Sequence, residues 1–223
     1  MIVTQELWTA VDDYITDRLV AADPALDEAL KASDAAGLPP IAVAPNQGKM
    51  LHIFAQMIGA KRVLEIGTLG GYSTIWLARA VPADGQVITF EFDPKHADVA
   101  RANLANAGVG DRVQVRVGAA LDSLPVLAQE NPEPFDLVFI DADKKSNPDY
   151  FQWALKLTKP GSVIIVDNVV RGGAVTDEES TSPDVVGTRR LFDVAGAEAK
   201  VTVTAVQTVG YKGYDGFLIA RVN

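Results

Sequence analysis

Cysteine is absent from all 223 residues of the chain. Its absence excludes disulfide bonds, zinc–thiolate sites, iron–sulfur clusters and thiol nucleophiles together. A chain without cysteine suits a reducing compartment, and we therefore expect a cytoplasmic protein.

Long apolar runs are also missing. No uninterrupted stretch approaches the roughly 18 residues that a membrane-spanning helix needs. The first residues, MIVTQELWTAVDDYI, lack the basic segment followed by an apolar segment that marks a secretory signal. We expect a protein that has no membrane partner.

Positive charge is scarce, because 20 Lys and Arg face 29 Asp and Glu and give a formal net charge of −9. An excess of negative charge opposes binding to a phosphate backbone, and no basic cluster with interleaved aromatic residues offsets it. We therefore expect no nucleic-acid partner.

The length and the 48% hydrophobic content allow one large core. We predict a single domain over residues 1–223, with helices and a loop in 1–45 and a catalytic core in 46–223. Apolar residues at steps of four predict a helix over 4–20, and Asp23-Pro24 is typical of a second helix start. The breaker-rich segment 37–48 is expected to be a loop that leads into a third helix.

Apolar, β-branched runs then alternate with segments of helical spacing, which predicts a parallel sheet covered by helices on both faces. The predicted strands are 62–67, 86–93, 112–118, 135–141 and 161–167. The last two, 201–208 and 216–222, are joined by only seven residues, too few for a parallel crossover. The pattern favours an open, doubly wound α/β sheet with an antiparallel final strand.

The first strand runs into a glycine-rich turn, EIGTLGGYS, at 65–73. Gly67, Gly70 and Gly71 leave room for a ligand near the backbone, and the following helix offers free amides to an anion. The spacing does not match the dinucleotide fingerprint G-x-G-x-x-G. Glu91 ends the second strand 20 residues after Gly71, the offset at which an acid binds ribose hydroxyls. A nucleoside with a small charged tail fits this pattern, and a turn that merely needs glycines is the alternative.

Oxygen-bearing side chains follow the fourth and fifth strands: Asp141 after the fourth, and Asp167 and Asn168 after the fifth. The carboxyl ends of neighbouring parallel strands meet at one edge of a sheet, so these side chains should converge. Three hard oxygen donors suit magnesium, with calcium or manganese as alternatives. Ordinary strand-end and turn residues are the competing interpretation.

Lys144 lies three residues after Asp141 and can fold back over the same strand ends. A lysine so placed can act as a general base on a hydroxyl. The alternative is an ion pair with Asp143. His52 and His96 lie on predicted helices without a spaced partner, and we expect surface or structural roles for both.

The motifs EIGTLGGYST, FEFDP, FIDADK and VDNVVRGG, in this order, resemble those of the cation-dependent O-methyltransferases of the catechol and caffeoyl-CoA type, within the class I S-adenosylmethionine-dependent methyltransferases. The resemblance implies a Rossmann-like seven-stranded sheet, order 3-2-1-4-5-7-6, with strand seven antiparallel. It implies Asp141, Asp167 and Asn168 as metal ligands and Lys144, with Asp141, as the catalytic pair. The cofactor set that it implies is Val43, Glu65, Gly67, Thr68, Ser73, Glu91, Ala120 and Asp141.

The same resemblance implies S-adenosylmethionine and a divalent cation as cofactors, a vicinal dihydroxy phenolic acceptor and a homodimer. A non-phenolic acceptor, a nicotinamide-dependent oxidoreductase on a similar sheet and a non-catalytic ligand-binding protein remain as alternatives. Ser146 departs from the family pattern, in which many members have Asn. That position and the irregular segment 171–184, a candidate flap, leave the choice of acceptor open.

Overall fold

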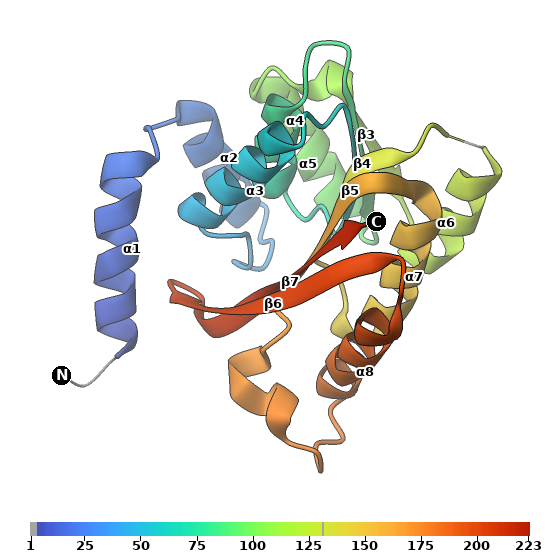
Figure 1. The fold of residues 1–223 in the computed structure, drawn as a ribbon. Helices are drawn as coiled ribbons and strands as arrows, with labels where there is room; N and C mark the ends of the chain where they lie inside the picture. Colours follow the sequence, from blue (N-terminus) through green and yellow to red (C-terminus); the bar gives the residue numbers. More distant parts are fainter. Residues whose placement is uncertain (1–3, 131) are drawn as a thin grey trace.

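The computed structural model describes residues 4–130 and 132–223. Its centre is one seven-stranded sheet in the order β3-β2-β1-β4-β5-β7-β6 (Figure 1). The strands are β1 (Arg62–Ile66), β2 (Gln86–Glu91), β3 (Val113–Val117), β4 (Phe135–Ile140), β5 (Thr158–Asp167), β6 (Val201–Gly210) and β7 (Gly213–Val222). The first five pair in parallel, and β7 is antiparallel to both β5 and β6. The predicted sheet order and the antiparallel seventh strand are confirmed.

Eight α-helices and three short 3-10 segments are found among the described residues. The helices are α1 (Gln5–Leu19), α2 (Pro24–Ala35), α3 (Pro45–Met57), α4 (Tyr72–Ala80), α5 (Pro94–Asn106), α6 (Ala120–Gln129), α7 (Asn147–Leu157) and α8 (Pro183–Ala197). The 3-10 segments are η1 (Gly110–Arg112), η2 (Lys144–Ser146) and η3 (Arg171–Thr176). The Asp23 side chain caps α2 by accepting from the backbone of Ala25 and Leu26, as the sequence predicts. No helix in the described ranges has the length and apolar character to cross a membrane.

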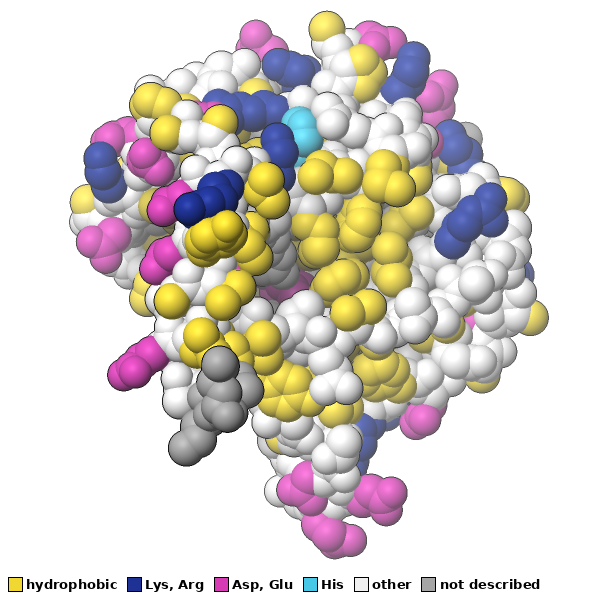
Figure 2. Space-filling model, turned by 60° about the vertical axis from the view of Figure 1, so that its left-hand side comes forward, with side chains coloured by type: hydrophobic (Ala, Val, Ile, Leu, Met, Phe, Trp, Pro, Cys, Tyr) yellow, Lys and Arg dark blue, Asp and Glu magenta, His cyan; other side chains and the backbone are white. Residues whose placement is uncertain are grey.

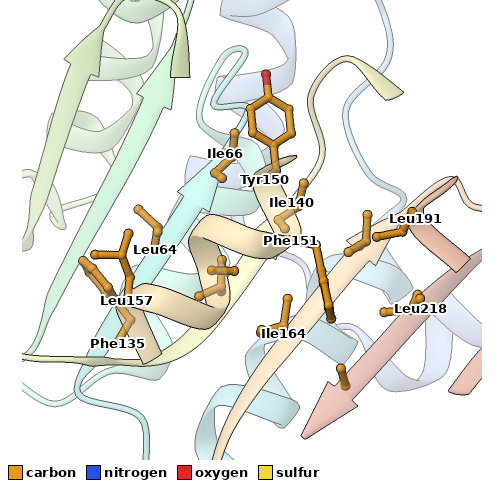
Figure 3. Close-up of a cluster of buried hydrophobic side chains, with 14 of the residues drawn as sticks. Leu64, Ile66, Phe135, Ile140, Tyr150, Phe151, Leu157, Ile164, Leu191 and Leu218 are labelled. Atoms are coloured by element: carbon orange, nitrogen blue, oxygen red, sulfur yellow. The ribbon is translucent and has the colours of Figure 1, made fainter. Parts of the chain in front are cut away.

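Each face of the sheet carries its own hydrophobic core, because successive strand residues point to opposite faces. Leu64 and Ile66 of β1 face a cluster that includes Phe151 of α7 and Leu191 of α8 (Figure 3). Val63 faces the other cluster, which α2, α3, α4 and α5 cover. Burial on both faces explains why the parallel strands are continuously apolar in sequence. It also fixes the strand tips, and with them the loops that follow.

Helix α1 forms as predicted, but its apolar residues do not face the core. Val11 is 48% exposed and Leu19 is 70% exposed, whereas the one buried residue of the helix is Asp12. Figure 1 shows α1 at the side of the molecule, beside the tip of the β6–β7 hairpin. A period-four pattern identifies a helix without saying what covers its apolar side.

The β6–β7 hairpin is longer than predicted. Its ladder extends to the pair Gly210 and Gly213, which leaves a turn of only Tyr211 and Lys212 instead of seven residues. Gly213 has φ +84°, a left-handed conformation that glycine adopts without strain. The tip is held from outside the sheet, since Gln5 Nε2 of α1 donates to the Gly210 carbonyl at 2.8 Å.

Other boundaries also differ from the sequence prediction, among them the start of β5 at Thr158 instead of 161 and the end of β2 at Glu91 instead of 93. Helix α3 begins at Pro45, inside the segment expected to be a loop, because proline suits the first turn of a helix. The segment 171–184 is only partly irregular, since η3 occupies its first residues and α8 begins at Pro183.

Candidate active site

Two cavities open beyond the carboxyl ends of the central strands. One has a volume of about 950 Å³ and the other about 230 Å³, and Ile41, Val43, Asp141 and Asn168 line both. Figure 2 brings the α1 side of the molecule forward, and hydrophobic side chains gather there beside a hollow. The carboxyl edge of a parallel sheet is the usual ligand site of this architecture.

The glycine turn after β1 borders the larger cavity. Gly67 has φ +105°, and a Cβ at this position would lie 2.1 Å from the Asp141 carbonyl oxygen. Only glycine therefore lets the tips of β1 and β4 approach so closely. Gly71, at φ +82°, forms the N-cap of α4, so the free amides of that helix face the turn.

Glu91 holds this turn in place. Its Oε2 accepts from the backbone of Leu69 at 2.7 Å, and its Oε1 accepts from the backbone of Asp93 at 3.0 Å. His96 Nδ1 lies 3.4 Å from Oε1, and His96 also lines the larger cavity. The contact with Glu91 is compatible with the structural role expected for His96, but the sequence interpretation did not place this residue at the cavity. Its place five residues after the strand-end acid, in the first turn of α5, is the signal that could have found it.

Most of the predicted cofactor set lies on the wall of the larger cavity. The members that line it are Val43, Gly67, Thr68, Ser73, Glu91, Ala120 and Asp141. Glu65 does not line it, because its carboxylate is completely buried and accepts from the hydroxyls of Ser73, Thr74 and Thr89. Glu65 reaches the cavity wall only through Ser73.

Burial raises the pKa of Glu65 to about 7 from its ordinary value of 4.5, although three hydroxyl donors favour the carboxylate. A raised pKa means that the folded protein holds this proton more tightly than the unfolded chain. The proton on Glu65 therefore stabilises the folded state fully below pH 4.5, and this stabilisation is lost as the pH rises through 7.

We expect the free energy of unfolding to fall by up to about 3 kcal/mol from Glu65 alone as the pH rises from 5 to 8. Glu65→Gln cannot ionise and should lack this part of the decline. Urea unfolding of both proteins at several pH values, in chelator, measures it. Identical pH slopes would contradict the assignment.

Asp141 and Asp167 are brought together by the register of the sheet. Ile140 of β4 pairs with Val166 of β5, so the two acids leave adjacent strand ends at the same level. Asn168 follows with φ +57°. All three side chains line the smaller cavity.

Asp167 is only 5% exposed, and both oxygens of its carboxylate accept hydrogen bonds. Oδ2 accepts from Gln47 Nε2 at 2.7 Å, and Oδ1 accepts from the backbone of Asn168 at 2.9 Å. Burial, with the nearby Asp141 second, raises the pKa of Asp167 to about 7. Lys144 offsets part of the repulsion between the two carboxylates, and a bound cation would offset more of it.

Lys144 is buried and donates from Nζ to Asp141 Oδ1 at 2.6 Å. The alternative pairing with Asp143 is wrong. Asp143 instead accepts hydrogen bonds from Ser146 Oγ and Tyr150 Oη, each at 2.6 Å. Burial and the hydrogen bond to Asp143 both raise the pKa of Tyr150. Ser146, the position that departs from the family pattern, thus holds Asp143 beside the catalytic candidate Lys144.

His52 has the structural role expected, since its Nδ1 lies 3.1 Å from the Trp76 carbonyl oxygen.

The donor set suits a hard cation. Asp141, Asp167 and Asn168 offer oxygen donors of the kind that magnesium, calcium and manganese prefer. Within the described residues no group of three or more His, Cys, Asp and Glu is arranged for a metal, and this site reaches three donors only by including the Asn168 amide. The site therefore lacks the ligands that soft metals and imidazole-preferring metals need.

Comparisons with known proteins identify the family of the chain. A family model described as O-methyltransferase matches residues 18–221. A catechol O-methyltransferase of Niastella koreensis is 50% identical to this chain, and the match covers 99% of this chain and 100% of the relative. A catechol O-methyltransferase of Mycobacterium tuberculosis is 57% identical, and the match covers 95% of this chain and 94% of the relative. The crystal structure of an O-methyltransferase from Bacillus cereus in complex with SAH has a TM-score of 0.98 and 55% identity, and the match covers 99% of this chain and 100% of that one.

Proposed function

This chain belongs to the O-methyltransferase family and is an enzyme; from that premise we propose that it moves a methyl group from S-adenosylmethionine to one hydroxyl of a vicinal dihydroxy aromatic ring, with a divalent cation. The alternatives of a nicotinamide-dependent oxidoreductase and a non-catalytic protein are wrong for this family. The observation that carries the proposal is that Asp141 and Asn168 line both cavities, with Lys144 on the wall of the larger one and Asp167 on the wall of the smaller one.

The larger cavity is the proposed cofactor site. SAH, which the Bacillus cereus relative binds, is the product that S-adenosylmethionine leaves after methyl transfer. Glu91 would accept hydrogen bonds from the ribose hydroxyls, and Ala120 would flank the adenine. The methionine end of the cofactor would be lined by Val43, Gly67, Thr68 and Ser73. Glu65 would act on that end through Ser73, whose Oγ donates to it at 2.6 Å.

The cation site is proposed at Asp141, Asp167 and Asn168, with magnesium as the expected ion and calcium or manganese as alternatives. When bound, the cofactor would supply the methyl group, and the cation, held by Asp141, Asp167 and Asn168, would act as a Lewis acid on the acceptor hydroxyls and lower their pKa. The two carboxylates provide the negative charge that holds such an ion. Asp141 lines both cavities and so connects the cation site with the cofactor site.

Lys144 is the proposed base. Lys144 lies at the wall of the larger cavity and, once it has released its own proton, would accept the proton of the acceptor hydroxyl. The chain contributes mainly by alignment, since fixing two reactants in line is worth roughly 7–11 kcal/mol of barrier. Burial around Lys144 also excludes water, which assists a reaction in which charge is neutralised.

The acceptor requirement can be tested by comparing catechol with resorcinol, whose hydroxyls are not adjacent. We expect methylated product from catechol and a value of kcat/KM for resorcinol lower by at least about 100-fold, because a site built for two oxygens rejects a ligand that offers one. Equal values would contradict a vicinal dihydroxy acceptor. Chromatographic detection of the methylated products measures both rates.

We also propose a homodimer in the cytoplasm that has no nucleic-acid partner. A homodimer is favoured by the exposed apolar residues Val11 and Leu19 of α1 and Met57 of α3, and light scattering would determine the mass. The net charge of −9 disfavours nucleic acid as a partner, and the lack of cysteine favours the cytoplasm.

A further inference from the structure

We propose that Gln47 is a positioning residue that orients Asp167 for the divalent cation. This inference rests on the proposed cation site and adds to it a residue from a distant part of the chain. Gln47 lies in the first turn of α3, 120 residues before Asp167, yet its Nε2 donates to Asp167 Oδ2 at 2.7 Å. Both side chains line the smaller cavity.

The chemistry of this contact suits an ion ligand. A carboxylate has about four lone-pair positions, so one bond to each oxygen of Asp167 leaves lone pairs free for a cation. The Gln47 amide brings no net charge. A lysine at this position would repel the ion, and an acid would add to the repulsion between Asp141 and Asp167.

Gln47 is itself held by a chain of hydrogen bonds. Asn46 Oδ1 accepts from the backbone of Gln47 at 2.9 Å, and Asn46 Nδ2 donates to Asp12 Oδ1 at 2.7 Å. Asp12 Oδ2 in turn accepts from the backbone of Tyr211 at 2.8 Å. These bonds give a function to Asp12, the one buried residue of α1. They fix the start of α3 against α1 and the hairpin tip, so the Gln47 amide approaches Asp167 from a rigid support.

Outer partners of this kind set the orientation of a metal ligand, and their loss typically costs 10–100-fold in metal affinity. Gln47→Met keeps the length of the side chain and removes the donor. We expect Gln47→Met to bind Mg²⁺ or Mn²⁺ about 10–100-fold more weakly, while its affinity for S-adenosylmethionine and its melting temperature stay close to those of the wild type. Gln56→Met, at an exposed position of the same helix, is the matched control and should bind the ion like the wild type.

Isothermal titration with the metal alone, supported by Mn²⁺ paramagnetic resonance, measures these affinities without turnover. A second measurement is the Mg²⁺ dependence of methyl transfer, where Gln47→Met should need more Mg²⁺ for half-maximal rate but reach a similar kcat at saturation. Equal ion affinity of Gln47→Met and wild type would overturn the positioning role and leave the proposed cation site standing. A wild-type protein that binds no divalent cation would overturn both.

Discussion

Lys144→Met is expected to lower kcat by about 10²–10⁴-fold, the usual contribution of a positioned general base. Methionine matches the length of lysine and keeps the buried position filled, but it cannot accept a proton. The substitution removes one positive charge beside Asp141, which Lys144 Nζ contacts at 2.6 Å. The ion affinity of the variant should therefore be unchanged or increased, because a competing cation has gone.

Rapid-quench measurement of methyl transfer at saturating cofactor and Mg²⁺ tests this expectation, with calorimetric titration of cofactor and ion as the check on binding. Lys156→Met, at an exposed position of α7, is the control and should keep the wild-type kcat. A fall in ion affinity large enough to account for the lost rate would assign Lys144 to the cation site rather than to proton transfer.

Asp167→Asn is expected to have the largest effect on ion binding. The variant keeps the shape of the side chain and loses one of the two carboxylates of the proposed cation site, both of which line the smaller cavity. The loss of affinity should exceed the roughly 10–100-fold expected for an outer partner such as Gln47. Methyl transfer at a limiting ion concentration should fall to the background rate.

Asp167 lines the smaller cavity but not the larger one. Cofactor affinity should therefore be unchanged in Asp167→Asn, and direct titration with S-adenosylmethionine distinguishes a specific loss of the ion from a general collapse of the site. If the variant bound Mg²⁺ as tightly as the wild type, the ligand assignment of Asp167 would be wrong.

The sheet was predictable because burial on both faces makes each parallel strand a continuous apolar run that helical segments separate. The last hairpin was predictable in direction but not in length. Its strands extend beyond the sequence prediction because Gly210 and Gly213 continue the ladder and α1 supports the tip. Such support comes from residues some 200 positions away and leaves no local signal in the sequence.

The strand-end residues Asp141 and Asp167 were predictable for the same topological reason, since parallel neighbours end at one edge. Gln47 was not, because it reaches the site from a helix whose packing decides which residues face the cavity. Glu65 shows a further limit. Its motif placed it near the cofactor, but the hydroxyls of Ser73, Thr74 and Thr89 enclose its carboxylate below the cavity wall.

The most direct measurement is the rate of methyl transfer from S-adenosylmethionine to catechol by the wild-type enzyme, with excess chelator and after Mg²⁺ is restored. The cation site proposed at Asp141, Asp167 and Asn168 predicts a rate at background in chelator and full recovery with Mg²⁺. Equal rates in both conditions would contradict it.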